Sequence, residues 1–328
     1  MGRLIEGRWS TVNSLLSDEK TGEFVREETT FRDWVRNDPA AEFPAEADRY
    51  HLYISRACPW AHRTTIMRRW KGLENAISLS IVEPVRIDDG WEFSETYPDP
   101  LFGSRYLREL YVRADPGATC RVTVPVLWDT KKETIVNNES REIMRMLDTA
   151  FEGIAEKNVT FYPEELSEEI DRVIDAIYEP INNGVYAGFA GTQAAYERAV
   201  TRLFEALDHW EEVLENQRYL CGDVPTEADI CLFTTLYRFD SVYSTHFKCN
   251  VRRIVDYPNL WNYLRELYQM PGVAATCNMD HIKRHYYMSH TWINPGQIVP
   301  MGPVLALEEP HNRGRLEANS PRVMAVEE

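Results

Sequence analysis

A cysteine at the junction between a strand-like and a helix-like segment is the residue best placed for nucleophilic chemistry. Residues 57–63 read Ala-Cys-Pro-Trp-Ala-His-Arg, after an extended run at residues 51–55 and before a run with apolar residues at helical spacing. Pro59 suits the first helical position, which makes Cys58 the N-cap, beside unpaired N–H groups and the positive end of the helix dipole. These surroundings favour the nucleophilic thiolate. The pattern therefore predicts a reactive Cys58, against the alternative of an inert buried cysteine that only caps the helix.

The position three residues after Cys58 decides how a disulfide on that cysteine could be resolved. A dithiol redox motif would read Cys-x-x-Cys, with the second thiol completing the exchange. Here Ala61 stands at that position. A mixed disulfide on Cys58 would therefore need a thiol from outside the chain, and glutathione is the obvious cytosolic candidate.

Composition excludes several classes of protein. The chain has 328 residues, enough for two domains, and a formal net charge of −16 at pH 7, which argues against nucleic-acid binding. No apolar run approaches the ~20 residues of a membrane span, and the first residues lack the apolar segment of a signal peptide. The six cysteines show no metal-ligand spacing. These features predict a cytoplasmic protein with reduced thiols, no metal and no membrane association.

The first half of the chain alternates strand and helix patterns. Residues 1–47 carry aromatic side chains without periodicity and are predicted to form an extension packed on the main body. From residue 48 the order is strand, helix, strand, a long insertion at about 84–118, two strands and a helix. Pro125 lies in the third strand and should mark an end or an edge, because proline cannot donate to the ladder.

The second half, from about residue 163, shows helical patterns. Apolar stripes with spacings of three and four occur at residues 170–177, 196–214 and 260–268. Thr226 and Asp229 form a capping-box variant, which marks another helix start. The expected fold class is therefore α/β plus all-α.

The first half of the chain has this order of strands and helices and a Cys-Pro helix start, and a helical half follows it. This arrangement resembles the glutathione transferase fold, whose N-terminal domain is thioredoxin-like. In thioredoxin-like proteins the bond before the proline of the third strand is cis, and the preceding residue offers its backbone to the bound thiol peptide. Val124-Pro125 stands at that place, and Glu139-Ser140 stands where transferases hold the γ-glutamyl end of glutathione. A helix N-terminus with a hydroxyl suits a carboxylate and Glu139 suits an ammonium, although Ser140 as a simple N-cap fits the local sequence equally well.

Further motifs sharpen this resemblance. The chain is similar, along almost its whole length, to the xi-class glutathione transferases, which are the glutathionyl-hydroquinone reductases. The motifs that carry the similarity are Ala-Cys-Pro-Trp-Ala-His-Arg, residues 121–129, Asn138-Glu139-Ser140, residues 245–249 and Ile293-Asn294-Pro295. The long insertion and the N-terminal extension fit this family better than the compact omega class, which shares the Cys-Pro core.

The family implies an enzyme that reduces glutathionyl-hydroquinones to hydroquinones. Cys58 would take the glutathionyl sulfur as a mixed disulfide, and a second glutathione would release oxidised glutathione. Tyr186 would be the proton shuttle at the ring, while Tyr243 and Tyr286 would hydrogen-bond the thiolate or a ring oxygen. With 17 tyrosines in the chain, a packing role is the alternative for each. One residue is missing after Tyr186 relative to the family pattern, which leaves its ring position open, and Tyr287 competes with Tyr286 for the site.

The same resemblance assigns the glutathione site. Trp91 would lie over glutathione or, as the alternative, would only anchor the insertion as a buried aromatic residue. Arg121 to Val124 would line the cysteinyl and glycyl parts of glutathione, with Arg121 favouring the carboxylate. The predicted glutathione-binding residues are Trp91, Arg121, Val122, Thr123, Val124, Pro125, Glu139 and Ser140.

The predicted domains are an N-terminal extension at 1–47, a thioredoxin-like glutathione-binding domain at 48–160, a helical substrate domain at 161–290 and a C-terminal extension at 291–328. The family also implies a homodimer with its interface in the helical half. Two other functions stay open from the sequence: an omega-like thioltransferase that deglutathionylates proteins, and a non-catalytic binding module with the transferase fold. The presence of Cys58 favours an enzyme.

Overall fold

The computed structural model of the chain describes residues 2–11, 17–318 and 322–323. The chain divides into two compact units, and neither unit is continuous in sequence. Unit 1 comprises Met1–Ser14, Glu27–Asn158 and Thr276–Val299, and unit 2 comprises Leu15–Arg26, Val159–Ala275 and Pro300–Glu328. The predicted domain boundaries stay predictions, and their residues 1, 12–16, 319–321 and 324–328 lie outside the described part of the chain.

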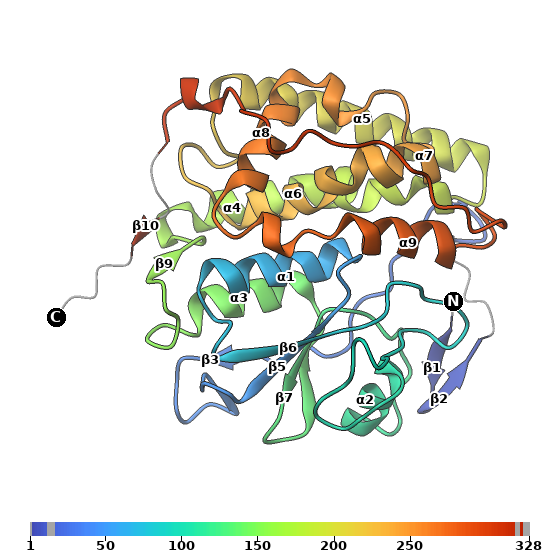
Figure 1. Cartoon of the computed structure of the whole chain (residues 1–328), viewed down its shortest axis with the longest axis vertical. Coiled ribbons are helices and arrows are strands. Elements are labelled where there is room, and N and C mark those ends of the chain that lie inside the picture. The colour runs from blue at the N-terminus through green and yellow to red at the C-terminus, as the bar shows by residue number, and fades with distance from the viewer. Residues whose placement is uncertain (1, 12–16, 319–321, 324–328) are drawn as a thin grey trace. The chain divides into compact units, whose positions relative to one another are not determined.

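A four-stranded mixed sheet forms the centre of unit 1 (Figure 1). Its strands are β5 (Tyr50–Ile54), β6 (Ile77–Ile81), β7 (Val126–Asp129) and β8 (Thr134–Asn137), in the spatial order β6-β5-β7-β8. The β5–β6 pair is parallel and the other two pairs are antiparallel. The predicted strands are confirmed, except that β7 begins only after Pro125, because proline cannot donate to the ladder.

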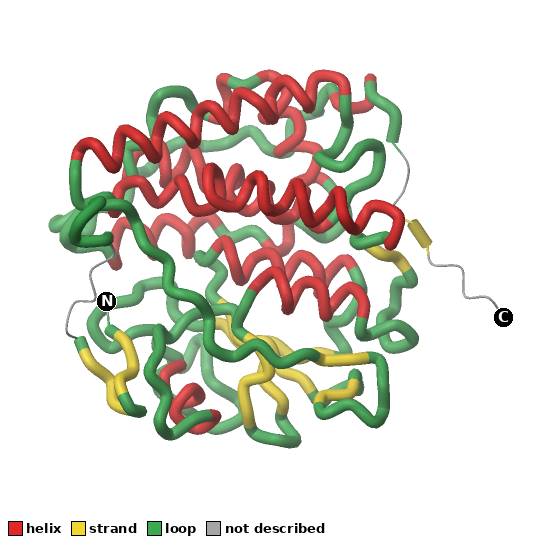
Figure 2. The backbone as a smooth tube through the Cα atoms, turned by 180° about the vertical axis from the view of Figure 1, so that it is seen from behind, coloured by secondary structure: helices red, strands yellow, loops and turns green. Residues whose placement is uncertain are grey.

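Three helices lie along this sheet. Helices α1 (Pro59–Trp70) and α3 (Ser140–Thr149) pack against each other on one side, and α2 (Leu107–Ala114) lies on the other (Figures 1 and 2). Cys58 is the N-cap of α1, as predicted, and Gly72 ends the helix with a φ of +66°, a conformation that glycine adopts without steric cost. Helix α2 lies inside the insertion, and the apolar pattern did not indicate it.

The rest of unit 1 surrounds this core. The hairpin β1 (Arg3–Ile5) and β2 (Arg8–Ser10) and the parallel pair β3 (Val35–Arg36) and β4 (Phe43–Pro44) come from the N-terminal extension. Helix α9 (Met279–Ser289), far away in sequence, contacts the insertion through two hydrogen bonds: His285 Nδ1 lies 2.8 Å from the Pro84 carbonyl, and Ser289 Oγ accepts from the Arg86 N–H at 2.9 Å.

Unit 2 is helical (Figure 2). Its longer helices are α4 (Ser167–Ile177), α5 (Gln193–Asn216), α6 (Glu227–Arg238) and α8 (Pro258–Gln269), and α7 (Ser244–His246) is a single short turn. Short helical turns and a small strand pair complete it: η1 (Glu164–Leu166), η2 (Tyr178–Asn183), η3 (Gly184–Phe189), η4 (Phe239–Tyr243), η5 (Ile254–Asp256), η7 (Arg313–Arg315), β9 (Val159–Thr160) and β10 (Arg322–Val323). The turn η6 (Ala274–Thr276) spans the boundary between the units. The three predicted helical stripes are confirmed as the buried faces of α4, α5 and α8.

The start of α6 confirms the predicted capping box. The Thr226 N–H donates to Asp229 Oδ2 at 2.7 Å, and the Asp229 backbone is capped in return by the Thr226 side chain. The buried Asp229 carboxylate also accepts from the Tyr263 hydroxyl at 2.7 Å, which ties α6 to α8. Among the described residues, no helix is both long and apolar enough to cross a membrane.

Candidate active site

Cys58 stands at the start of α1 with its side chain directed at the loop before β7. Its N–H donates to the Ser55 carbonyl (3.1 Å), its carbonyl accepts from the His62 N–H (3.0 Å), and its Sγ lies 3.5 Å from the Val124 carbonyl oxygen. The Val124–Pro125 bond is cis, as in thioredoxin-like proteins. The half-buried thiol thus lies between a helix N-terminus, which favours the thiolate, and the loop assigned to glutathione.

The other cysteines are less suited to nucleophilic attack. Burial raises the pKa of Cys221 and of Cys249 to about 12, and burial also raises the pKa of Cys120. Cys277 is half-buried but caps no helix. Cys58 combines accessibility with a helix N-terminus, and we therefore take it as the candidate nucleophile.

The start of α3 presents a carboxylate and a hydroxyl. Glu139 is the N-cap residue, and its Oε1 accepts from the Arg141 N–H at 3.3 Å. Ser140 is the first helical residue, and its buried Oγ donates to the same Glu139 oxygen at 3.4 Å. The interpretation of Ser140 as a simple N-cap is therefore wrong, because Glu139 has that role. The Ser140 hydroxyl and the first N–H groups of α3 are suited to a carboxylate.

Tyr111 of α2 joins the two loops that carry the predicted glutathione residues. Its hydroxyl donates to the Thr123 carbonyl (2.9 Å) and accepts from the Thr123 N–H (3.2 Å) and from Asn138 Nδ2 (3.1 Å). One hydroxyl thus holds the loop before β7 against the loop before α3. Sequence reasoning missed Tyr111 because a single tyrosine in an insertion carries no motif.

Arg121 is engaged by the N-terminal extension. Its Nε donates to Glu27 Oε1 at 3.0 Å, and the same oxygen accepts from Arg3 Nη1 at 3.1 Å. The extension continues alongside the predicted site, where Thr29 Oγ1 lies 3.5 Å from Glu139 Oε2. Arg121 therefore already has a carboxylate partner within the chain, and its predicted role with glutathione stays a prediction.

Trp91 is buried in the insertion, with an imidazole and a guanidinium beside its ring. The ring stacks on His285 of α9, with centroids 5.0 Å apart and an interplanar angle of 18°, and the guanidinium carbon of Arg86 lies 5.3 Å from its centroid. Within the described part of the chain, Trp91 Nε1 has no hydrogen-bond partner. Trp91 therefore anchors the insertion, and its contact with glutathione stays a prediction.

Arg86 is a charged residue of this region that sequence reasoning missed, since a lone arginine in a loop forms no motif. Its guanidinium is half-buried and makes no hydrogen bond to any residue that the structure describes, and its Nε is shielded from solvent. Burial lowers the pKa of Arg86 to about 10, and the positive charge of Arg121 lowers it further, whereas Cys58 and Tyr111 act in the opposite direction. Arg121, Cys58 and Tyr111 are therefore near enough to act on the charge of Arg86.

Tyr286 belongs to unit 1, the unit that also contains Cys58. Tyr286 and Tyr287 are both buried on α9. The Tyr286 ring lies beside His285 and His290, at centroid distances of 5.1 and 5.8 Å. Which of the two tyrosines faces Cys58 stays a prediction.

Tyr186 and Tyr243 are neighbours in unit 2. Their ring centroids are 6.2 Å apart, and Phe24 of the N-terminal extension stacks on Tyr186 at 5.4 Å. The guanidinium carbon of Arg26 lies 4.9 Å from the centroid of the Tyr186 ring. The structure thus brings two of the three predicted tyrosines together, and their approach to Cys58 stays a prediction.

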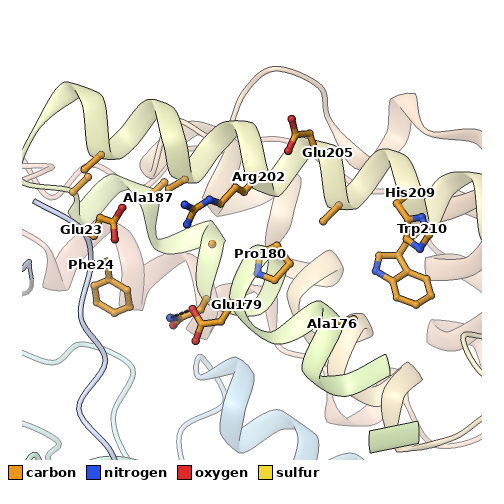
Figure 3. A pocket seen from close by; sticks show the side chains of 16 residues that line it. Glu23, Phe24, Ala176, Glu179, Pro180, Ala187, Arg202, Glu205, His209 and Trp210 are labelled. Atoms are coloured by element: carbon orange, nitrogen blue, oxygen red, sulfur yellow. Dashed lines mark hydrogen bonds between the residues drawn. The ribbon is translucent and has the colours of Figure 1, made fainter. Parts of the chain in front are cut away.

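A pocket of about 520 Å³ lies in unit 2, beside the turn that carries Tyr186 (Figure 3). Alanine side chains form much of its wall, and Phe24, which stacks on Tyr186, lines it as well. Its carboxylates and its guanidinium come from Glu23, Glu179, Glu205 and Arg202. Three carboxylates against one guanidinium are unfavourable for an anionic ligand such as glutathione, so this pocket is a poor candidate for the glutathione site.

Fold and candidate site together are those of the glutathione transferase class: a thioredoxin-like sheet with a cysteine at a helix start, and a helical unit. Two family models match the chain. They are "Glutathione S-transferase, N-terminal domain" at residues 57–150 and "Glutathione S-transferase, C-terminal domain" at residues 193–266. The first range contains Cys58, Glu139 and Ser140.

Individual relatives narrow the family. The chain is 51% identical to the glutathionyl-hydroquinone reductase YqjG of Escherichia coli (strain K12), over 95% of this chain and 98% of the relative. The structure of a xi-class glutathione transferase from Natrialba magadii matches with a TM-score of 0.92 and 56% identity, over 97% of this chain and 98% of the other. The glutathione-bound structure of YqjG matches with a TM-score of 0.87 and 48% identity, over 95% and 99%. The chain belongs to the xi class of glutathione transferases, the glutathionyl-hydroquinone reductase family, which confirms the predicted family and fold class.

Proposed function

We propose that this chain reduces glutathionyl-hydroquinones to hydroquinones with glutathione as the reductant and Cys58 as the nucleophile. The observation that carries the proposal is the half-buried Cys58 thiol at the start of α1, 3.5 Å from the Val124 carbonyl, with alanine at the position of a resolving cysteine. The relative YqjG, which is named a glutathionyl-hydroquinone reductase and has a glutathione-bound structure, supports the substrate class.

In the proposed reaction the Cys58 thiolate attacks the sulfur that joins glutathione to the ring. The carbon–sulfur bond breaks with its electron pair on the ring carbon, which takes up a proton, and a Cys58–glutathione disulfide forms. The thiolate of a second glutathione then attacks the glutathionyl sulfur of that disulfide and releases the Cys58 thiolate. The ring thus exchanges sulfur for hydrogen, and the two glutathionyl groups leave as oxidised glutathione.

Protonation of the ring needs its own residues. An aryl carbanion is a poor leaving group, so the ring must pass through its keto tautomer before the carbon–sulfur bond breaks, and this needs a proton donor and acceptor close to the ring. We assign this role to Tyr186, with Tyr243 and Tyr286 as hydrogen-bond donors to the thiolate or a ring oxygen. The pairing of the Tyr186 and Tyr243 rings in unit 2 supports a shared role.

Glutathione itself would bind along unit 1. Its γ-glutamyl carboxylate suits the Ser140 hydroxyl and the N-terminus of α3, and its ammonium suits Glu139. The backbone of Val124 would pair with the cysteinyl part, which places the glutathione sulfur next to Cys58. Trp91 and the remaining residues of 121–125 would line the peptide.

The test follows free hydroquinone and oxidised glutathione formed from a glutathionyl-hydroquinone in excess glutathione. We expect equal amounts of both products from the wild type and essentially no turnover from Cys58→Ser. Tyr186→Phe should slow hydroquinone release by about 10²-fold or more, because it removes the proton donor. Cys277→Ser, which changes the other half-buried cysteine, should keep full activity. A wild-type protein that binds glutathione but releases no hydroquinone would contradict the proposal.

The setting of the enzyme is part of the proposal. We place it in the cytoplasm as a homodimer whose interface lies in the helical half, with the domain boundaries given by the sequence. The six free cysteines suit a reducing compartment. Light scattering during gel filtration should give twice the chain mass of 38.2 kDa, and a monomer mass would contradict the dimer.

A further inference from the structure

Arg86 and Arg121 both act on the region around Cys58, but they differ in their partners. Arg121 donates to Glu27 at 3.0 Å, and Glu27 is shared with Arg3, so these residues satisfy one another within the extension and the loop before β7. Arg86 donates no side-chain hydrogen bond to any residue that the structure describes. Its charge is therefore not neutralised by a carboxylate in contact.

A shielded guanidinium without partners is unfavourable, because it loses hydration and gains no hydrogen bond in return. The Trp91 ring, 5.3 Å from the Arg86 guanidinium carbon, compensates only in part. The indole N–H of Trp91 is also buried without a described partner. The lowered pKa of Arg86 has the same cause, since burial disfavours the cation. The terminal nitrogens of Arg86, which unlike its Nε are not shielded from solvent, are therefore the donors available to an anion from outside the chain.

The position of Arg86 limits which anion this can be. Cys58 is close enough to act on the charge of Arg86, but no hydrogen bond joins the two side chains. A tripeptide bound with its sulfur at Cys58 would have its γ-glutamyl carboxylate at Ser140 and its ammonium at Glu139. Its glycyl carboxylate remains, and Arg121, which the family resemblance assigns to it, is already paired with Glu27, so Arg86 is the neighbouring cation without a carboxylate partner in the part of the chain that the structure describes.

We propose that Arg86 binds the glycyl carboxylate of the glutathionyl group and thereby makes the enzyme specific for the complete tripeptide. The inference rests on the proposed function, which places glutathione in unit 1. A guanidinium suits this role because its planar fork can give a carboxylate two parallel hydrogen bonds. Arg86 would be a specificity-determining residue and would take no part in proton or sulfur transfer. Trp91 would hold its guanidinium in place from the ring face.

The test is a binding comparison in the Cys58→Ser background, where no chemistry interferes. Calorimetry measures the affinity for glutathione and for its glycine amide, which lacks the carboxylate but keeps every other group. With Arg86 present, we expect glutathione to bind at least about tenfold more tightly than the amide, as for a hydrogen-bonded ion pair. With Arg86→Met the two affinities should become equal, through loss of glutathione binding. With Arg86→Lys part of the preference should return.

The comparison of two ligands on one variant keeps the result independent of any partial unfolding, because misfolded protein lowers the active fraction for both. Arg105→Met is the matched control, since Arg105 lies in the same insertion with an exposed side chain paired to Glu92. It should keep the preference for glutathione over the amide. An Arg86→Met variant that weakens both ligands equally, or neither, would overturn the inference, because Arg86 would then act on the thiolate or on Trp91.

Failure of this inference and failure of the proposed function are distinguishable. The binding ratio needs no turnover, so a protein inactive on glutathionyl-hydroquinones can still show the Arg86-dependent preference. Conversely, an active wild type with no preference for the carboxylate would overturn only the role of Arg86. In the active enzyme, Arg86→Met should raise KM for the glutathionyl-hydroquinone and leave kcat nearly unchanged, because the carboxylate of its glutathionyl group is bound equally before and during the reaction.

Discussion

At the scale of single residues, the reactivity proposed for Cys58 rests on where its thiol lies, since all six cysteines share the same intrinsic chemistry. Burial raises the pKa of Cys221 and Cys249 to about 12, so only about one thiol in 10⁵ is ionised at pH 7 at these positions. Cys58 has the opposite surroundings, half-buried at a helix N-terminus, and the thiolate is the nucleophile. The same reasoning distinguishes Arg86 from Arg121 as a binding group, because Arg121 is paired with Glu27 and Arg86 has no carboxylate partner among the described residues.

The start of α3 allows ligand binding to be separated from helix capping. Glu139 caps the helix and Ser140 does not, so Ser140→Ala should change the free energy of unfolding by less than about 1 kcal/mol. It removes a hydroxyl proposed to bond the γ-glutamyl carboxylate of the substrate's glutathionyl group, and KM for the glutathionyl-hydroquinone should rise about tenfold. Steady-state kinetics and urea unfolding measure the two effects.

The matched control is Ser167→Ala, because Ser167 is also the first residue of a helix, α4, but in unit 2. This variant should leave KM unchanged. If Ser140→Ala lowers stability by several kcal/mol and leaves KM as it is, the γ-glutamyl end binds elsewhere.

At the scale of elements, α2 connects the insertion to the glutathione site. Tyr111→Phe removes the hydroxyl that bonds the Thr123 backbone and the Asn138 amide. Two buried donors would lose their partner, and the free energy of unfolding should fall by about 2–4 kcal/mol. KM for glutathione should rise as well, because the loop at residues 121–125 is no longer held against the start of α3. Urea unfolding and steady-state kinetics measure these changes.

The comparison for this prediction is Tyr162→Phe in unit 2, which removes the hydrogen bond from the tyrosine hydroxyl to Asp171 at 2.8 Å. It should cost less stability, about 1 kcal/mol, and should not move KM. A Tyr111→Phe variant with unchanged KM would show that α2 supports the fold without positioning the site.

Elements with strong periodicity were predictable from the sequence, and contacts from distant segments were not. The apolar stripes of α4, α5 and α8 identify these helices because one face of each is buried. Cys58 was predictable as an N-cap because Pro59 marks the helix start. Tyr111 and Arg86 were not, since their roles depend on which loops the fold brings beside the insertion. The presence of α9 in unit 1 likewise depends on tertiary contacts that no local pattern encodes.

At the scale of the whole molecule, the division into two units separates the proposed chemistry. Unit 1 contains Cys58, Arg86 and Tyr286, together with the proposed glutathione residues, and unit 2 contains Tyr186 and Tyr243. Sulfur transfer is thus assigned to one unit and ring protonation mainly to the other. A fold with this division can keep the glutathione chemistry constant while residues of the helical unit set which aromatic ring is accepted.

Two buried histidines, one in each unit, have strongly lowered pKa values, and they make stability depend on pH. Burial lowers the pKa of His51 in unit 1 and of His246 in unit 2 to about 4. Because an unfolded histidine titrates near ~6.5, the unfolded chain binds more protons between pH ~6.5 and 4. The contribution of His51 and His246 to the free energy of unfolding is complete above pH ~6.5 and is lost as the pH falls through about 4. The raised pKa values of Asp229 and Asp240 oppose this loss at the acid end, since these carboxyls bind protons first in the folded state.

The free energy of unfolding should therefore fall with decreasing pH, at up to about 1.4 kcal/mol per pH unit for each histidine. His51→Gln removes one of the histidines with a lowered pKa, which also include His246, His281 and His311, and should reduce the slope between pH 6.5 and 5. His209→Gln is the control, because His209 is exposed and its replacement should leave the slope unchanged. Urea unfolding followed by circular dichroism at several pH values measures the slope. An unchanged slope in His51→Gln would mean that His51 keeps its ordinary protonation behaviour in the folded protein, and that His246 or the carboxyl groups control the acid stability.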